Sequence, residues 1–134
     1  MELAEARFPL HFDKHEFRQD SAGDGQFRGG TGVDLELTVE TDKPALANTA
    51  GDGIKYGSRG MVGGQDSKPH EYSLRKQDGT ARQLKTKEIS VNVDPGDKFI
   101  IRSAGGGGWG DPVKRSSEAR ALDFKNEITS DNKA

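Results

Sequence analysis

The sequence predicts a mainly β protein, built as a small antiparallel sheet or barrel-like sandwich with glycine-rich loops and one C-terminal helix. Residues 33–40, VDLELTVE, alternate strictly between apolar and polar side chains, as a strand with one buried face does. Asp78-Gly79 and the Asp-Pro-Gly-Asp stretch at 94–97 are turn sequences between further apolar runs. A helical pattern begins only after Ser116.

The composition is that of one folded domain, residues 1–134, with a thin core that would gain from contacts with other subunits. The net charge is −2, and basic and acidic residues are interspersed along the chain. The sequence therefore shows neither the basic surface that nucleic-acid binding needs nor a polybasic patch for a membrane. The absence of cysteine excludes disulfides and thiolate sites. Neither a secretory signal nor a membrane-spanning run is present, so we expect a cytoplasmic protein.

The remaining strands follow from alternation and turn residues. An edge strand is expected within 7–18, where neither face is cleanly apolar and Pro9 stands near the start. Further strands are expected at 72–74, 81–84, 87–93 and 98–103, and a short strand or a turn at 45–50. Their core-facing residues are expected to be Ile89, Val91, Val93, Phe99 and Ile101. Ser116 or Ser117 should cap a helix over 117–128, and the tail 129–134 should fray.

Glycine-rich loops occupy much of the chain, and the stretch 105–108 holds four glycines in a row before the only tryptophan, Trp109. Four glycines lose much conformational entropy on ordering, so a tight turn, a ligand or a partner's backbone must compensate. Phe27 is the other large aromatic in such a loop. Each aromatic is either a core plug beneath its loop or an anchor for a partner.

Several patterns resemble reactive or binding sites, and each has a plainer interpretation. Gly105, Gly107 and Gly110 formally give G-x-G-x-x-G, but the helix and the βαβ unit that a dinucleotide site needs are missing. His11, Asp13 and His15 alternate on one strand, about 7 Å apart, which is awkward for one metal ion. In the first glycine loop, turn and capping roles suit Asp20, Ser21 and Asp24. Three arginines beside glycine loops either clamp an anion, form interface pairs or are solvated: Arg18, Arg28 and Arg59.

Three stretches together resemble a known family. They are FPLHFDKHEFRQDSAGDGQFRGGTGV at 8–33, YGSRGMVGGQDSKPHEYSLR at 56–75, and VDPGDKFIIRSAGGGGWGDPVKRSSEARALDF at 93–124. Their R-G-G-x-G and G-G-G-G-W-G-D-P blocks, in this order, resemble the C-terminal part of the hydantoinase B/oxoprolinase family. Ala22 stands in place of a family glycine, and Ser116-Ser117 in place of Asp-Pro. His11 and His15 stand where the family has other residue types, which weakens a metal site further.

The resemblance implies a role within a larger assembly. Family chains are several times longer, and acetophenone carboxylase-like enzymes, which carry a small subunit of this size, are the most similar case. It implies a biotin-independent complex that uses ATP and a divalent cation, with no cofactor and no metal on this chain. The implied partners are larger hydantoinase A-like and hydantoinase B-like subunits, with neither nucleic acid nor membrane involved.

The first hypothesis is therefore an accessory subunit, not catalytic alone, that completes the hydantoinase B-type subunit of an ATP-dependent ketone carboxylase. A hydantoinase or oxoprolinase complex is the alternative reaction. No catalytic residue is expected, and the residues expected to dock or to shape the loops are Phe27, Arg28, Gly29, Gly30, Trp109, Gly110 and Asp111. A second hypothesis gives Arg28 or Asp111 a direct part in substrate binding. A third is an independent β module for a small ligand, which the lack of an apolar pocket lining opposes.

Overall fold

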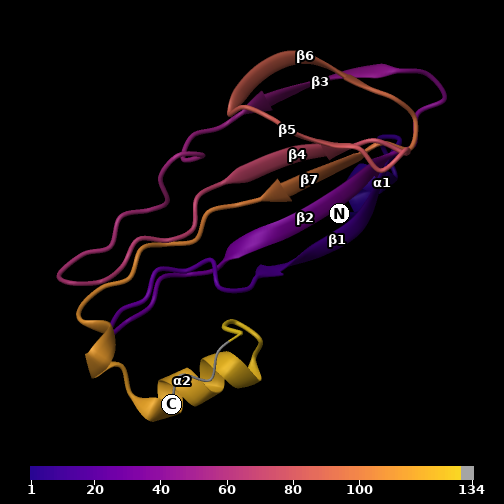
Figure 1. Ribbon diagram of the computed structural model, residues 1–134. Helices are drawn as coiled ribbons and strands as arrows, with labels where there is room; N and C mark the ends of the chain where they lie inside the picture. The colour runs from indigo at the N-terminus through magenta and orange to yellow at the C-terminus, as the bar shows by residue number, and fades with distance from the viewer. Residues whose placement is uncertain (131–134) are drawn as a thin grey trace. The chain divides into compact units, whose positions relative to one another are not determined.

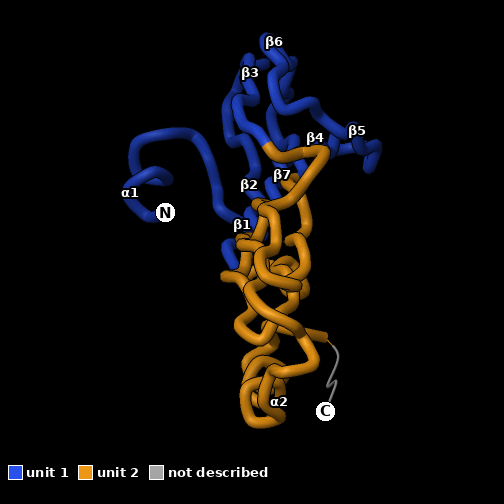
Figure 2. Tube along the Cα trace, turned by 90° about the vertical axis from the view of Figure 1, so that its left-hand side faces the viewer, with its two compact units in different colours: residues 1–16, 34–52, 71–102 blue, residues 17–33, 53–70, 103–134 orange. Residues whose placement is uncertain are grey.

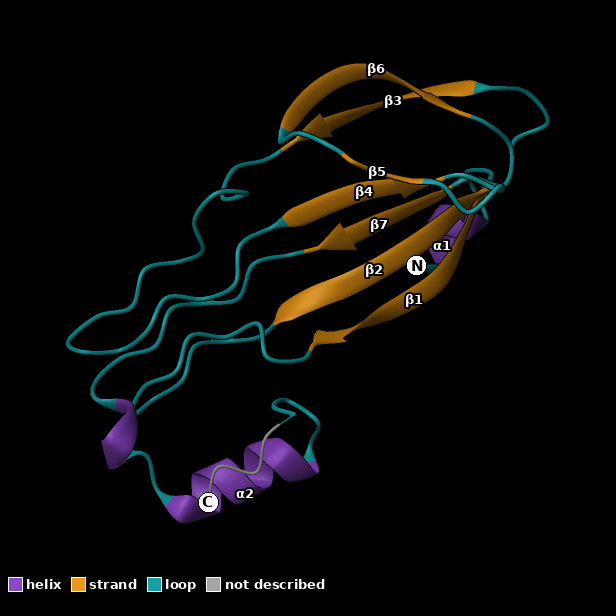
Figure 3. Ribbon diagram, viewed as in Figure 1, coloured by secondary structure: helices purple, strands orange, loops and turns teal. Residues whose placement is uncertain are grey.

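The computed structural model describes residues 1–130 and is mainly β (Figure 3). Its elements are α1 (Glu2–Glu5), β1 (Leu10–Arg18), β2 (Gly32–Val39), β3 (Ala45–Ala50), β4 (Glu71–Arg75), β5 (Ala81–Gln83), β6 (Lys87–Val93), β7 (Lys98–Arg102), the 3-10 helix η1 (Pro112–Lys114) and α2 (Ser117–Lys125). The contacts group into two compact units (Figure 2). Unit 1 comprises residues 1–16, 34–52 and 71–102, and unit 2 comprises residues 17–33, 53–70 and 103–134.

The strands form antiparallel sheets, as the sequence predicts. One sheet has five strands in the order β1-β2-β7-β4-β5, and β7 lies antiparallel to both β2 and β4 (Figure 1). The second sheet is the antiparallel pair of β3 and β6. The antiparallel sheets and the helix near the C-terminus are confirmed, whereas neither sheet closes into a barrel.

The core of unit 1 is small and lies where the alternating strands predict it. Its buried cluster consists of Val39, Leu74, Leu84, Val91 and Val93. The β2–β7 register places Leu37 opposite Phe99 and Leu35 opposite Ile101. These apolar pairs share one face of the sheet because side chains alternate along each strand. Ile100 points to the other face and is nevertheless buried.

Ile89 corrects the prediction for β6, because its side chain is 79% exposed while Val91 and Val93 are buried. The β3–β6 register shifts next to it, so that two residues of β6, Ile89 and Ser90, stand opposite Asn48 alone. Ser90 takes a positive φ of 55°, and its N–H donates to Asn48 Oδ1 at 2.9 Å. This bulge inserts one residue into the alternation, so the residues before it reverse their faces.

The turn between β6 and β7 is fixed by a buried carboxylate. Asp97 is 1% exposed, and its Oδ2 accepts hydrogen bonds from the Asp94 N–H at 2.8 Å and from Lys76 Nζ at 2.6 Å. Gly96 supplies the positive φ of 80° that the turn requires. The hydrogen bonds of Lys76 to Asp94 and then to Asp97 raise the pKa of this lysine above its ordinary value. The predicted turn is therefore present, and an ion pair joins its Asp97 to Lys76, the residue that follows β4.

The C-terminal helix is present but shorter than predicted. Ser116 caps it, since its Oγ accepts the Ala119 N–H at 3.2 Å, and α2 ends at Lys125 rather than at 128. Glu127 takes a positive φ of 57°, which interrupts the helix. The Ser130 N–H donates to Asp20 Oδ1 at 2.9 Å. Of the tail expected to fray, residues 131–134 lie outside the described part of the chain.

Candidate functional site

Unit 2 contains three glycine-rich segments, called here the first (17–33), second (53–70) and third (103–111) segments. They lie against one another backbone to backbone, as the adjacent teal loops in Figure 3 show. The Gly23 N–H donates to Gly106 O at 2.9 Å, which joins the first segment to the third. The Gln65 N–H donates to Asp24 O at 2.7 Å, and the Gly108 N–H donates to Gln65 O at 2.9 Å. Hydrogen bonds therefore join each of the three segments to the other two, in the manner of a small irregular sheet.

Glycine is required at these contacts because no room remains for a Cβ. A Cβ added at Gly29 would lie 1.9 Å from Gly106 O, and one at Gly108 would lie 2.0 Å from Asp24 O. Nothing lies within 4 Å of a Cβ added at Gly30. The entropy lost by ordering the glycine run is thus offset by close backbone packing within the chain itself.

The G-x-G-x-x-G pattern takes part in the same packing. A Cβ at Gly107 would lie 2.1 Å from Arg59 O, and one at Gly105 would lie 2.4 Å from Ser21 O. The preceding strand β7 pairs antiparallel on both sides, so the surrounding unit is not the βαβ of a dinucleotide fold. In unit 2 these glycines serve contacts between loops.

Phe27, Trp109 and Met61 form a row of large apolar side chains across the three segments, called here the apolar row. Phe27 and Trp109 exchange two backbone hydrogen bonds of 3.0 and 2.8 Å, and their rings lie 5.8 Å apart at a 44° tilt. Met61 forms an isolated parallel β-bridge with Trp109. The three side chains are 60%, 48% and 58% exposed, in the order Phe27, Trp109, Met61. They are therefore not core plugs, and large apolar side chains remain exposed on a closely hydrogen-bonded backbone.

Arg28 is held inside unit 2 rather than projecting from it. Its Nε donates to Asp123 Oδ1 at 2.9 Å, and its Nη1 donates to the carbonyl of Gly29 at 2.8 Å. Asp123 is the buried residue of α2, at 7% exposure, and its other oxygen accepts from Arg115 Nη2. The carboxylate of Asp123 in α2 thus binds the guanidinium groups of both Arg28 and Arg115, and this contact fixes the position of the Arg28 side chain.

The other predicted docking or shaping residues have different surroundings. Asp111 caps η1, because its Oδ1 accepts the Val113 N–H at 3.0 Å. Gly110 is buried and takes a positive φ of 74°, whereas Gly30 is exposed. The structure therefore brings Phe27 and Trp109 together at the surface and uses Gly29, Gly110 and Asp111 to shape the loops.

Two of the remaining sequence candidates, Asp13 and Arg18, have structural partners. Asp13 Oδ2 accepts from the Thr38 hydroxyl at 2.5 Å, and Oδ1 pairs with Lys98 at 3.0 Å, contacts that lower the pKa of Asp13. Within residues 1–130 no three histidine, aspartate or glutamate side chains come close enough together to hold a metal ion. The buried Arg18 donates to the carbonyls of Pro69 at 2.7 Å and Ser103 at 3.1 Å.

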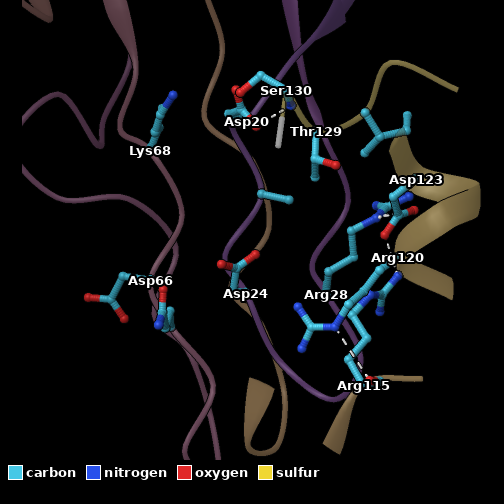
Figure 4. Close-up of a pocket in the computed structure, with 13 residues that line it drawn as sticks. Asp20, Asp24, Arg28, Asp66, Lys68, Arg115, Arg120, Asp123, Thr129 and Ser130 are labelled. Atoms are coloured by element: carbon cyan, nitrogen blue, oxygen red, sulfur yellow. Dashed lines mark hydrogen bonds and ion pairs between the residues drawn. The ribbon is translucent and has the colours of Figure 1, made fainter. Parts of the chain in front are cut away.

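A polar cavity of about 430 Å³ lies within unit 2, between the glycine-rich segments and α2 (Figure 4). Arg28, Arg115 and Arg120 gather around Asp123 on the helix side, and Asp24 lies across from them. The lining is completed by Asp20, Ala22, Gln65, Asp66, Lys68, Ile128, Thr129 and Ser130.

The family profile of hydantoinase B/oxoprolinase matches residues 1–112, which includes the glycine-rich segments and the apolar row. The chain belongs to the hydantoinase B/oxoprolinase family. Caprolactamase subunit beta of Pseudomonas jessenii is 30% identical over 135 residues, covering 97% of this chain and 23% of that protein. The 5-oxoprolinase of Saccharomyces cerevisiae is 33% identical over 110 residues, covering 81% of this chain and 8% of that protein.

Two solved structures contain the same fold. The crystal structure of the ATP-dependent caprolactamase from Pseudomonas jessenii superposes with a TM-score of 0.78 at 26% identity, over 96% of this chain and 22% of that one. A nucleotide-free acetone carboxylase superposes with a TM-score of 0.75 at 20% identity, over 96% and 21% of the two chains, which relates the folds alone. The chain thus spans less than a quarter of the length of these relatives. Among residues 1–130, no helix has the length and apolar character needed to span a membrane.

Sequence reasoning missed Asp123 as a residue that lines this cavity. The large apolar residues of α2, Leu122 and Phe124, are 57% and 44% exposed, while Asp123 is buried. The available signal was the pair of arginines, Arg28 and Arg115, within a chain of nearly balanced charge. Their common partner becomes visible only when the helix is placed against the loops.

Proposed function

We propose that this chain acts as an accessory, non-catalytic part of an ATP-dependent enzyme complex, where it completes a larger hydantoinase B-type subunit. The observation that carries the proposal is the apolar row, in which Phe27, Trp109 and Met61 remain about half exposed on a closely packed backbone. Exposed aromatic and methionine side chains are enriched at the centres of protein interfaces. Support comes from the caprolactamase chain, in which the matching region is 22% of a much longer polypeptide.

The partner in this proposal is the remaining part of a hydantoinase B-type chain, with a hydantoinase A-like subunit in the same complex. ATP and a divalent cation would be bound by those larger subunits, and the complex would be cytoplasmic. Phe27 and Trp109 would contact the partner, whereas Arg28, Gly29, Gly110 and Asp111 would shape the loops that present them. A direct substrate contact by Arg28 would use its Nη2, because Nε and Nη1 donate to Asp123 and to the carbonyl of Gly29.

The reaction we propose is ATP-dependent, biotin-independent ketone carboxylation of the acetophenone carboxylase type, which rests on the resemblance of the sequence blocks at 8–33, 56–75 and 93–124. The alternative is ATP-dependent opening of a cyclic amide. The caprolactamase beta subunit at 30% identity and the yeast 5-oxoprolinase at 33% favour this alternative. Assaying the reconstituted complex with a ketone plus bicarbonate, and separately with a lactam or 5-oxoproline, distinguishes the two by which substrate stimulates ATP hydrolysis.

Co-expression with the larger subunits encoded beside the gene tests the accessory role. The wild-type chain should co-elute with them in gel filtration, and Trp109→Ala should weaken that association about tenfold or more, as loss of a hot-spot aromatic does. Ile89→Ala is the matched control, since Ile89 is 79% exposed but lies in unit 1 outside the apolar row. A chain that stays monomeric beside every such subunit, or a Trp109→Ala variant that assembles like wild type, contradicts the proposal.

A further inference from the structure

The cavity of unit 2 carries an excess of positive charge on its helix side. Arg28 and Arg115 share a single carboxylate, that of Asp123. Arg120 donates only to backbone carbonyls, those of Pro112 and Arg115. Within the described residues, three guanidinium groups are therefore balanced there by one carboxylate.

These guanidinium groups are oriented and still have free donors. The hydrogen bonds of Arg28 use Nε and Nη1, so that its Nη2 makes none within residues 1–130. Those of Arg120 use Nε and Nη2, so that its Nη1 makes none there. Because their other nitrogens are fixed by the protein, a ligand that bonds to these donors loses little side-chain freedom.

Three further carboxylates line the cavity, those of Asp20, Asp24 and Asp66. Asp20 is half-buried, and its Oδ1 accepts the Ser130 N–H at 2.9 Å. Asp24 and Asp66 are exposed to solvent, whereas Arg28, Arg115 and Arg120 are half-buried. Water and salt screen exposed charges more strongly than half-buried ones. Asp66 also accepts a hydrogen bond from the Gly60 N–H at 2.7 Å, and the exposed Lys68 lines the same side.

We propose that this cavity binds a small oxyanion, a carboxylate, bicarbonate or phosphate group, between Arg28 and Arg120. Planar guanidinium groups with adjacent free N–H donors match the oxygens of these anions. The cavity volume of about 430 Å³ admits an anion that is part of a larger small molecule. The proposal is independent of the accessory function, because it uses no residue of the apolar row and needs no second chain.

Nitrogen-15 NMR of the full chain tests the site through the arginine Nε–H signals. Sodium phosphate, acetate and bicarbonate are titrated separately, with sodium chloride at equal ionic strength as the reference. We expect saturable shifts of the Arg28 and Arg120 signals with an apparent Kd of about 1 mM, the affinity that two charge-assisted contacts support. The anion that binds most tightly identifies the chemical group recognised.

Arg120→Gln should weaken this binding about tenfold, and Arg120→Lys, which keeps the charge but not the planar fork, by a smaller factor. Arg59→Gln, an exposed arginine that does not line the cavity, is the matched control and should bind like wild type. Arg120→Lys also serves if the glutamine variant does not fold. Shifts that chloride reproduces, or that persist unchanged in both Arg120 variants, overturn the proposal.

Discussion

Replacing Gly29 by alanine should disrupt the glycine-rich packing of unit 2, whereas the same change at its neighbour Gly30 should not. The added Cβ at Gly29 would lie 1.9 Å from the oxygen and 2.3 Å from the carbon of the Gly106 carbonyl. Ordinary contacts of a Cβ begin at 3.4 Å, so one backbone must move by more than an ångström. A Cβ at Gly30 meets nothing within 4 Å, and its φ is not in the left-handed region.

The size of the effect follows from the bonds that such a movement breaks. The Gly23 N–H donates to Gly106 O, and the Gly106 N–H donates to Gly30 O, at 2.9 and 2.8 Å. Two lost backbone hydrogen bonds at about 1 kcal/mol each, with an overpacking term of about 1–3 kcal/mol, give a destabilisation of about 3–5 kcal/mol. Gly30→Ala should change the free energy of unfolding by about 0.5 kcal/mol or less.

Urea unfolding of the full chain, followed by the fluorescence of Trp109, measures both variants. Trp109 is a suitable reporter because it lies in the same set of loops and is the only tryptophan of the chain. A Gly29→Ala variant that unfolds at the same urea concentration as Gly30→Ala would refute the argument that close backbone packing selects glycine here.

Three further outcomes are expected. Asp123→Ala should lower the free energy of unfolding by about 2 kcal/mol in urea titrations, because Arg28 and Arg115 lose their shared partner; an unchanged midpoint contradicts this. The pKa of Lys76 is raised, so its stabilising ion pairs are complete below the ordinary value of 10.5 and are lost as the pH rises through the raised value. The Tm difference between wild type and Lys76→Met should therefore shrink at the alkaline end of a scan from about pH 8 to about pH 12, and a constant difference counts against it. Val62→Gly should stabilise the chain by about 1 kcal/mol in urea titrations, because Val62, a β-branched residue, has a φ of 54°; a lower midpoint refutes the strain.

The sheets could be predicted because their signals are local. Residues 33–40 alternate, and β2 spans Gly32–Val39 with Val39 in the core cluster. The turn at 94–97 was equally predictable, since Pro95 and Gly96 favour their own backbone angles. Ile89 could not be placed, because the bulge beside it depends on pairing with β3 and on the contact of Ser90 with Asn48.

The candidate site was predicted in part. Its glycine blocks and both aromatics, Phe27 and Trp109, were evident in the sequence. The contact between the two aromatics was not, because they are 82 positions apart and meet through a backbone bridge. The buried side of α2 could not be predicted from the residues of the helix alone. Periodicity indicates an apolar buried face, yet α2 packs through Asp123 because the surface that it meets presents guanidinium groups.

The sequence by itself determined the β class, the turns, the family blocks and the presence of a glycine-rich centre, since each is encoded within a few neighbouring residues. Only the tertiary structure decided what the four glycines at 105–108 are for. Their contacts, such as that of Gly108 with Asp24 O and that of Gly107 with Arg59 O, join residues far apart in the chain. The space available to a Cβ is set by the neighbouring backbone, and no local pattern of residues records it.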